Sequence, residues 1–406
     1  MPLVVQKYGG TSVADPDRVR AVAGRVARAR AAGNELVVVV SAMGKTTDDL
    51  LALARQVSEA PSKRELDMLL TVGERVTMAL LAMALHDLDV QAISFTGSQS
   101  GILTDGNHSA ARIVDVRPDR IRAELERGRV VIVAGFQGVN PGTREITTLG
   151  RGGSDTTAVA LAGALGPALC EIYTDVAGVH TADPRLVPGA RVIPRLGYRM
   201  CSTLAHLGGR VLHARCVDLA ARHRVPIVVR SSFDDEPGTF IGGDDMEGAR
   251  IEAITHRDDV SIAIAEGNAG GRGEARAIIE AVADALPELE LIAHEQTGEQ
   301  HHALVWIGTR GDAETLKQRF RELRGPGMEW RLDLEHGTGF VSVVGLGLGA
   351  AHVTRAEAAL DRARVPTLAL RATPTALIFR VGGGRCADAV RALHAAFFET
   401  VPARTA

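Results

Sequence analysis

The stretch LGRGGSDTTAVALAGALG, residues 149–166, joins a glycine-rich turn to small apolar residues at helical spacing. Together with the preceding EITT it predicts strand, turn and helix, with Ser154 or Asp155 as the helix cap. Three glycines surround Arg151: Gly150, Gly152 and Gly153. Because a structural turn needs only one glycine, we interpret this turn as a ligand site. The Arg151 guanidinium fits a carboxylate there, and Asp155 accepts from an ammonium group or orients a nucleophile.

Strand-like apolar runs alternate with helix-like segments through the first 240 residues. Strands are expected at PLVVQKY (2–8), ELVVVVSAM (35–43), VQAISF (90–95), RVVIVAGF (129–136), CEIYTDV (170–176) and VPIVVRSS (225–232). Continuous apolar strands separated by helices predict an α/β fold, a mostly parallel sheet sandwiched by helices. Ligands bind such sheets at the carboxyl ends of the strands.

A polar, Gly/Pro-rich stretch at 234–250 predicts a domain boundary. Beyond it the pattern βαββα occurs twice, as a repeat of roughly 80 residues with the order of a small ferredoxin-like βαββαβ domain. We therefore expect three domains, at 1–245, 250–330 and 331–406, and expect the last two to pair. Such a pair behind an α/β domain favours regulation or simple dimerisation.

The composition excludes several classes of protein. The net charge is −3, so no overall field favours nucleic acid or a membrane surface. Aromatic residues make up only 3%, which predicts an aliphatic core. The four cysteines form no CxxC pair, as expected of reduced, buried thiols. With no signal-peptide pattern at the start and no apolar run near membrane-span length, we expect a cytoplasmic protein.

A second glycine turn follows the first predicted strand, in QKYGGTS. Gly9 and Gly10 lack Cβ atoms and let backbone N–H groups approach phosphate oxygens, while Lys7 supplies a point charge. No Gly-Lys-Ser/Thr follows, so this is not a Walker A loop, and no dinucleotide fingerprint is present. A purely structural turn remains an alternative for this motif.

Two further strand ends carry polar residues. In VVVVSAMGKTTDDL, Ser41 follows a strand and Thr47 is the expected N-cap of a helix; hydroxyls and helix-end amides there can hold a carboxylate. In IYTDVAGVHTADPRLVP, Thr174, Asp175 and Arg185 can hold a nucleotide or form a generic loop. Glu74, in TVGERV, is an exposed glutamate or a ligand for a substrate amino group. No histidine spacing typical of a metal site is present, and we predict no protein metal ligands.

These segments resemble the aspartokinases of the amino-acid kinase superfamily, which carry tandem ACT domains at the C-terminus. The matching segments are VVQKYGGTSV, VVVVSAMGKTTDDLL, DMLLTVGERV, SFTGSQSGILTD, ARIVDV, VIVAGFQGVN, TTLGRGGSDTTAVALA, CEIYTDVAGVHTADPR and VPIVVRSSF. The resemblance implies transfer of the γ-phosphoryl group of ATP, with Mg²⁺, to the β-carboxylate of L-aspartate, which gives 4-phospho-L-aspartate for lysine and threonine biosynthesis. It also implies an intertwined ACT pair that forms a homodimer or a higher homo-oligomer.

The resemblance also implies roles for particular residues. Lys7 would stabilise the transferring phosphoryl group, and Asp155 would position the reacting groups. The implied aspartate site comprises Ser41, Thr47, Glu74, Arg151, Gly152 and Asp155. The implied ATP site comprises Lys7, Gly9, Gly10, Thr174, Asp175, His180, Arg185 and Arg210.

The chain departs from the family pattern around the nucleotide. His180 stands where the family usually has Tyr, and a ring remains for stacking. Arg210 replaces the usual Lys, which keeps the charge but changes the geometry. Cys201, Ser202 and Thr203 replace an acidic helix pattern.

The departures are larger in the ACT region. An acidic-x-Pro-Gly turn reads GNAGGRGEA here, and the Gln-Asn effector pair is replaced by His294-Glu295. A Ser-Thr-Ser-Glu strand reads RATPTAL, with Pro374 expected inside a strand, where proline removes a backbone donor. We therefore expect feedback by lysine or threonine to be weakened or lost, with the ACT pair serving mainly for dimerisation.

Two other interpretations stay open. One is another acid kinase of the superfamily, acting on glutamate, an N-acetylated acid or a modified aspartate. The other is a catalytically weak regulatory or scaffolding subunit that keeps the fold. The acid-kinase alternative is disfavoured by the residues of the implied aspartate site, Ser41, Thr47, Glu74 and Arg151. The regulatory-subunit alternative is disfavoured by the intact residues Lys7, Arg151 and Asp155.

Overall fold

The computed structural model describes residues 1–166, 168–209, 211–243, 250–268, 272–286, 289–297, 301–323 and 329–399. These residues fall into two compact units. The first unit comprises Met1–Thr181 and Arg191–Glu247, and the second comprises Ala182–Ala190 and Gly248–Ala406. A nine-residue insertion from the first part of the chain thus belongs to the second unit.

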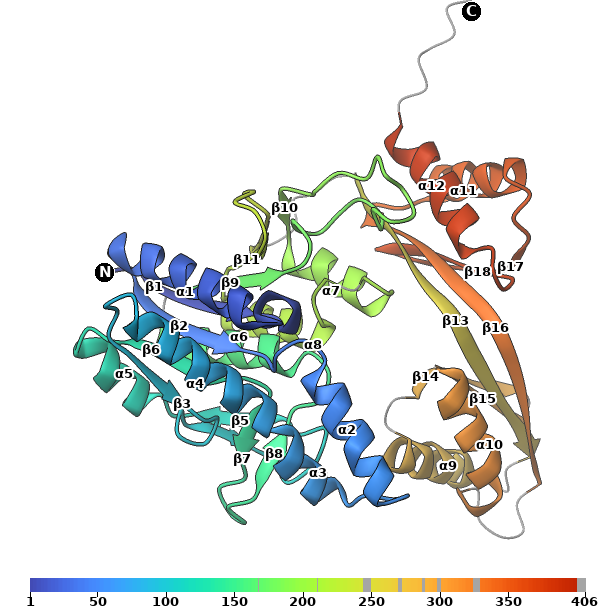
Figure 1. Ribbon diagram of the computed structural model, residues 1–406. Helices are drawn as coiled ribbons and strands as arrows, with labels where there is room; N and C mark the ends of the chain where they lie inside the picture. The colour runs from blue at the N-terminus through green and yellow to red at the C-terminus, as the bar shows by residue number, and fades with distance from the viewer. Residues whose placement is uncertain are drawn as a thin grey trace, which may run out of the picture. The chain divides into compact units, whose positions relative to one another are not determined.

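An eight-stranded sheet forms the centre of the first unit, in the order β10-β12-β11-β9-β1-β2-β6-β3 (Figure 1). Its strands are β1 (Leu3–Tyr8), β2 (Glu35–Val40), β3 (Ala92–Phe95), β6 (Val130–Ala134), β9 (Ala168–Thr174), β10 (Arg195–Leu196), β11 (Ile227–Ser231) and β12 (Thr239–Ile241). The strands from β11 to β3 in this order run parallel to one another. Their carboxyl ends therefore share one edge, and the predicted fold class is confirmed.

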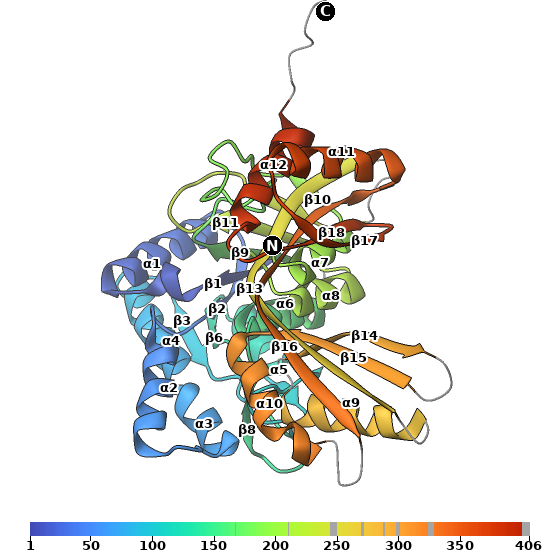
Figure 2. The same ribbon diagram turned by 90° about the vertical axis from the view of Figure 1, so that its right-hand side faces the viewer.

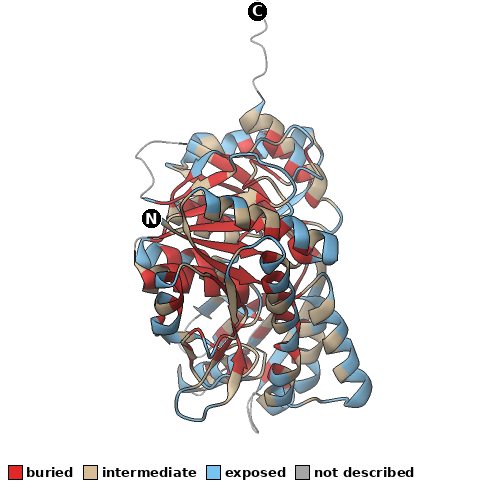
Figure 3. Cartoon of the chain, turned by 60° about the vertical axis from the view of Figure 1, so that its left-hand side comes forward, coloured by how far each residue is buried: buried red, intermediate tan, exposed pale blue. Residues whose placement is uncertain are grey.

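Buried apolar strands and covering helices explain this sheet. The sequence ELVVVV of β2 is buried at five of six positions, as expected for a strand covered on both faces. Figure 3 shows the buried residues concentrated along these strands. The helices of this unit are α1 (Pro16–Ala31), α2 (Thr46–Val57), α3 (Lys63–Leu70), α4 (Val72–His86), α5 (Asp119–Glu126), α6 (Gly153–Leu165), α7 (Tyr198–His206) and α8 (Ala214–His223), with a short 3₁₀ helix at Gly10–Val13.

Alternation along the strands assigns the helices to faces. Tyr8 and Val38 point into a core shared with α1 and α4. Because successive side chains point to opposite faces, Lys7 faces the other way, where it meets α6. The sheet edge and the start of α6 therefore approach each other.

The stretch Lys63–His86 is, by length and composition, long and apolar enough to cross a membrane. The expectation that no run approaches that length is therefore wrong. The stretch is two helices, α3 and α4, that meet at Thr71. On α4, Leu81 and Leu85 pack into the hydrophobic core with α1 and the sheet, so we interpret α4 as a core helix.

A second, four-stranded sheet of the first unit has the order β5-β4-β7-β8. Its strands are β4 (Ile102–Thr104), β5 (Ile113–Val116), β7 (Gln137–Val139) and β8 (Ile146–Thr148). Only the last of them, which leads into the 149–153 turn, was expected from the sequence. The other three are three or four residues long and too short for a periodic pattern.

The second unit is built on a six-stranded antiparallel sheet in the order β14-β15-β13-β16-β18-β17 (Figure 2). Its elements are β13 (Arg250–Asn268), α9 (Arg272–Ala285), β14 (Glu290–Thr297), β15 (His301–Gly308), α10 (Arg310–Leu323), β16 (Trp330–Leu346), α11 (Ala350–Arg362), β17 (Thr367–Thr373), β18 (Ala376–Val381) and α12 (Cys386–Phe398). The βαββα order therefore occurs twice, as predicted. The long strands β13 and β16 join the two repeats into one sheet.

The apolar run VSIAIAE, from which a strand is expected, begins at Val260, but β13 begins ten residues earlier, at Arg250. A register shift between Arg257 and Val260 and a left-handed Asp259, with φ of 49°, interrupt the apolar pattern there. Pro374 was expected inside a strand, and this is wrong: it lies in the turn between β17 and β18. A residue in this turn does not have to donate a backbone hydrogen bond to a neighbouring strand, so the proline does not disrupt the sheet.

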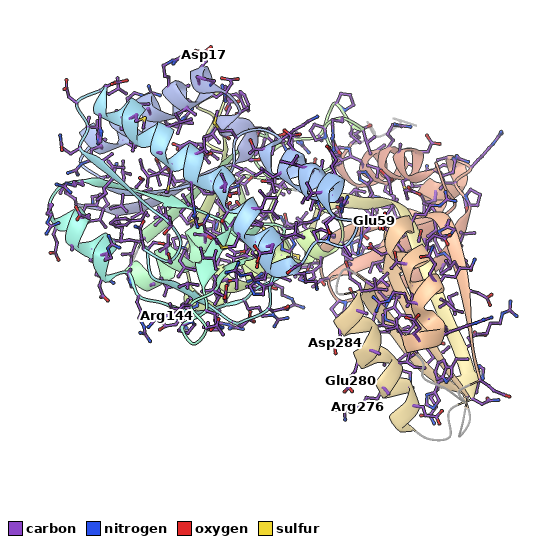
Figure 4. All side chains as sticks on the ribbon, turned by 60° about the horizontal axis from the view of Figure 1, so that its bottom comes forward. Asp17, Glu59, Arg144, Arg276, Glu280 and Asp284 are labelled. Carbon is purple, nitrogen blue, oxygen red and sulfur yellow. The ribbon has the colours of Figure 1, made fainter. Side chains whose placement is uncertain are left out.

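The helices of the second unit are amphipathic. On α9, Ala275, Ile278 and Val282 are buried. Figure 4 shows Arg276, Glu280 and Asp284 along one edge of the same helix. Arg276 Nε lies 2.7 Å from Glu280 Oε1, an i,i+4 pair typical of an exposed helix face.

Candidate active site

The end of β1 carries a buried ion pair. Lys7 Nζ lies 2.6 Å from Asp155 Oδ1, in the first turn of α6. The two side chains are only 11% and 13% exposed. A buried ammonium is costly without a partner, so the ion pair with Asp155 stabilises the Lys7 side chain at the sheet edge.

The glycine turn after β1 lies against two neighbouring strand ends. A Cβ at Gly9 would lie 3.4 Å from Lys7 Nζ, and one at Gly10 would lie 3.0 Å from the Ala42 carbonyl oxygen. Gly9 N donates to Tyr173 O at 3.2 Å, and Gly44 N donates to Gly10 O at 3.1 Å. The loops after β1 and β2 therefore meet the end of β9, and the backbone at Gly9 and Gly10 forms a cradle beside Lys7.

Glu74 reaches the same edge from α4. Its Oε1 accepts from Ala42 N at 3.1 Å, and the residue is only 3% exposed. Its Oε2 is buried and has no hydrogen-bond partner in the described part of the chain. Burial raises the pKa of this carboxyl from 4.5 to about 7. Such a group is suited to a ligand that brings its own donor.

Ser41 and Thr47 follow β2. Ser41 N donates to Tyr8 O at 3.1 Å, which places the residue beside the glycine turn. The expectation that Thr47 caps a helix is wrong, because α2 starts at Thr46 and its N-cap is Lys45. Thr46 Oγ1 instead donates to Met43 O at 2.6 Å. Thr47 is half-buried in the first helical turn, and its hydroxyl caps nothing.

The 149–153 turn presents Arg151 outward. Gly150 and Gly152, with φ of 72° and 68°, adopt left-handed conformations on either side of Arg151. Arg151 is exposed and makes no hydrogen bond or ion pair with any residue that the structure describes. Its guanidinium is therefore available to a ligand.

The expected caps of α6 are wrong. Gly152 is the N-cap and no side chain caps the helix. Ser154 is buried against Gly135, where an added Cβ would lie 2.7 Å from the Ser154 hydroxyl oxygen. Asp155 pairs with Lys7 instead. Gly153 N donates to Gly150 O at 3.0 Å, and no side chain caps the amides that follow it, which suits an anion at this helix end.

The expected nucleotide residues are less closely grouped. Thr174 ends β9 beside Gly9, and its hydroxyl donates to Asp175 Oδ1 at 3.0 Å. His180 Nδ1 lies 3.0 Å from Gly178 O. Arg185 belongs to the insertion Ala182–Ala190 of the second unit, where it pairs with Asp183 and lowers the pKa of that carboxyl. Arg210 lies outside the described residues.

Comparison with known proteins identifies the family. The model of the amino acid kinase family matches residues 2–231. An aspartokinase of Mycolicibacterium smegmatis is 52% identical over 297 residues, which cover 72% of this chain and 70% of that protein. This chain belongs to the aspartokinases of the amino acid kinase family. It is accordingly a kinase, an ATP-dependent phosphotransferase.

Solved aspartokinase structures agree with this. Aspartokinase III of E. coli in complex with aspartate and ADP, in its R-state, has a TM-score of 0.81 at 25% identity. The same enzyme in complex with lysine and aspartate, in its T-state, has a TM-score of 0.72 at 26% identity. Each match covers 98% of this chain and 100% of the other.

Two polar clusters of this aspartokinase were missed in the sequence. One lies within β1 and β9, where Tyr8 and Tyr173 stack with ring centroids 4.8 Å apart and Gln6 Nε2 donates to Glu171 Oε2 at 2.9 Å. Polar residues at alternate positions of otherwise buried strands were the available signal. The other cluster centres on Asp67. This residue lies in an ordinary helical sequence pattern, and nothing in that pattern distinguishes it from a surface carboxylate.

Proposed function

We propose that this aspartokinase transfers the γ-phosphoryl group of ATP to the β-carboxylate of L-aspartate, giving 4-phospho-L-aspartate. The observation that carries the proposal is the Lys7–Asp155 pair at the sheet edge that Glu74 also reaches. A cation held in place and a buried carboxylate oxygen without a partner suit a phosphoryl donor and an amino-acid acceptor.

The acceptor site suits a small amino dicarboxylate. Glu74 accepts from the α-ammonium group of the substrate, and the Arg151 fork binds a carboxylate. Ser41, Thr47 and the backbone at Gly152 add donors for the remaining oxygens. Asp155 holds Lys7 between the acceptor and the phosphates, so catalysis rests on positioning and charge neutralisation without a covalent intermediate.

The donor site suits a nucleoside triphosphate. The cradle at Gly9 and Gly10 admits phosphate oxygens where a Cβ would intrude. Thr174 and Asp175 bind the nucleotide beside it. His180, which belongs to the same unit, extends this site, whereas Arg185 belongs to the second unit and Arg210 lies outside the described residues. Mg²⁺, which is bound mainly by phosphate oxygens and water, enters with ATP and neutralises its charge.

We also propose three domains, with the kinase at 1–245 and ACT domains at 250–330 and 331–406, in a cytoplasmic homodimer or higher homo-oligomer. The edge strand β17 is mostly exposed, including Leu368, which supports pairing of ACT domains between copies. The four cysteines, free and buried, agree with a reducing compartment.

Feedback by lysine or threonine is weakened or lost in this proposal. His294 stands in place of the family's effector residue, and its Nε2 lies 3.0 Å from His302 Nδ1. The imidazole is thus engaged within the sheet. Pro374 no longer supports this part of the proposal, because it lies in a turn.

An aspartyl-hydroxamate assay with ATP and Mg²⁺ tests the reaction. We expect turnover with L-aspartate and at most trace turnover with L-glutamate or N-acetyl-L-aspartate. Preference for either of the latter would favour another acid kinase. No turnover with any of these acids would favour a regulatory subunit.

A further inference from the structure

Asp67 is a fully buried carboxylate that the proposed reaction does not use. It lies in α3 with no exposed surface. Its Oδ1 accepts from Thr148 Oγ1 at 2.6 Å and from Ser109 N at 3.1 Å. Its Oδ2 lies 2.6 Å from His108 Nδ1 and 3.2 Å from Ser109 N. A carboxylate that has lost its water is stable only with this many donors.

The donors come from segments far apart in the sequence. His108 and Ser109 belong to the loop between β4 and β5, and Thr148 is the last residue of β8. Ser109 has a φ of 68°, which a non-glycine residue rarely adopts, and its amide points at Asp67 in that conformation. The carboxylate therefore ties α3, a strained loop and the end of β8 together.

Each tied segment leads to a residue of the proposed aspartate site. Thr148 precedes Arg151 by three residues, and α3 is separated from the α4 of Glu74 only by Thr71. The loop also supports the turn directly, because a Cβ at Gly150 would lie 3.1 Å from Ser109 O. Among the described residues, no hydrogen bond ties Asp67 to the loops after β1 and β9, where the nucleotide is proposed to bind.

We propose that Asp67 is a positioning residue for the acidic substrate. It holds the Arg151 turn and the start of α4 at the spacing at which Arg151 and Glu74 bind one small amino acid. That the small amino acid is aspartate rests on the proposed function. The inference predicts that loss of the Asp67 hydrogen bonds weakens binding of the acceptor and spares binding of ATP.

The variants are chosen around the hydrogen bonds. Asp67→Asn keeps the shape but leaves one acceptor oxygen and turns an amide N–H toward donors. Thr148→Val removes one donor at constant volume, and Thr148→Ser keeps it. The matched control is Glu124→Gln on α5, since Glu124 is also buried and accepts from Arg127 and Arg129 at 2.7 and 2.9 Å.

The measurement is the KM for aspartate and for ATP, with the thermal unfolding midpoint of each variant. Because small misplacements of binding groups are costly, Asp67→Asn should raise the KM for aspartate about tenfold or more, with that for ATP changed less than about twofold. Thr148→Val should raise the KM for aspartate about threefold, and Thr148→Ser and Glu124→Gln should match the wild type. Calorimetric titration with aspartate should show the same order of affinities.

The inference would be overturned if the folded Asp67→Asn variant has an unchanged KM for aspartate. It would also be overturned if the KM for aspartate and the KM for ATP rise equally. If Asp67→Asn fails to fold, Thr148→Val against Thr148→Ser decides by the same criterion. A wild type that turns over no aspartate would contradict the proposed function instead, and the KM comparison would then be made with the acid that it does accept.

Discussion

The sheet edge of the first unit and the sheet of the second unit differ in how some of their ionisable side chains are partnered. At the edge, the buried Glu74 Oε2 and the exposed Arg151 guanidinium have no hydrogen-bond partner among the described residues. In the second unit, His294 lies against His302, and His336 lies between Ser261 and Glu314 at 2.8 and 3.0 Å. Charged groups held without a partner indicate a place built for a ligand, whereas ionisable groups that satisfy one another indicate structure.

The largest effect is expected at Lys7. Lys7→Met removes the charge that we propose lies beside the transferring phosphoryl group and leaves Asp155 unpaired, so kcat should fall about 10²- to 10³-fold. The hydroxamate assay measures it. Lys317→Met, at an exposed position of α10 in the second unit, is the control and should leave kcat unchanged. A Lys7→Met enzyme with more than about a tenth of the wild-type kcat would break the comparison.

Arg151→Lys keeps the charge but removes the fork. Since a hydrogen bond to a charged group contributes about 1.5–3 kcal/mol, the KM for aspartate should rise about 10- to 100-fold. The KM for ATP should stay the same in steady-state kinetics. Arg144→Lys, in the loop before β8, serves as the control, and equal effects at both positions would argue against a bidentate role for Arg151.

Glu74 should make aspartate binding depend on pH. Its pKa of about 7 means that the carboxylate needed by the substrate ammonium forms as the pH rises through 7. The KM for aspartate should therefore fall about tenfold between pH 6 and pH 8. The Glu74→Gln variant should bind aspartate weakly at every pH. If its KM for aspartate falls with pH as in the wild type, the pH dependence does not come from Glu74.

The raised pKa of Glu74 also makes the stability of the protein depend on pH. A rise in pH should improve aspartate binding but lower the free energy of unfolding. The fold favours protonated Glu74, whose ordinary pKa is 4.5. Its contribution to the free energy of unfolding is complete below 4.5 and is lost as the pH rises through 7. Urea unfolding of the ligand-free protein against Glu74→Gln at pH 5 and pH 8 measures this. A Glu74 contribution that grows from pH 5 to pH 8 would contradict the burial account.

The smallest effect is expected in the second unit. Lysine and threonine should change the rate less than about twofold, against the 5- to 150-fold typical of allosteric coupling. The resemblance implies that the family has Gln at the position of His294. Inhibition that appears in the His294→Gln variant and not in the wild type would trace the loss of feedback to this residue. Strong inhibition of the wild type would show that the paired histidines still admit an effector.

Much of the sheet edge was predictable because several of its polar residues and glycines lie at, or directly after, the end of a continuous apolar strand. Lys7, Gly9, Ser41 and Thr174 were found in this way. The ion pair between Lys7 and Asp155 was not, since two strand–helix turns 148 residues apart meet only in the folded sheet.

Tertiary context explains the rest. Asp67 has the spacing of any helical carboxylate, and only its donors from other segments reveal its role. Arg185 follows the pattern of a nucleotide loop but folds with the second unit, because Ala182 and Val187 pack into the hydrophobic core there. Pro374 was judged by strand propensity, although a two-residue turn separates β17 from β18.

The central claim is that an amino dicarboxylate binds between Glu74 and Arg151 with its side-chain carboxylate toward Lys7. A crystal structure of the protein with L-aspartate and ADP tests it most directly. The account predicts the α-ammonium group within hydrogen-bond distance of Glu74 Oε2, a carboxylate on the Arg151 guanidinium and the β-carboxylate facing Lys7. Aspartate bound away from Glu74 and Arg151, or with its ammonium group toward Lys7, would contradict it.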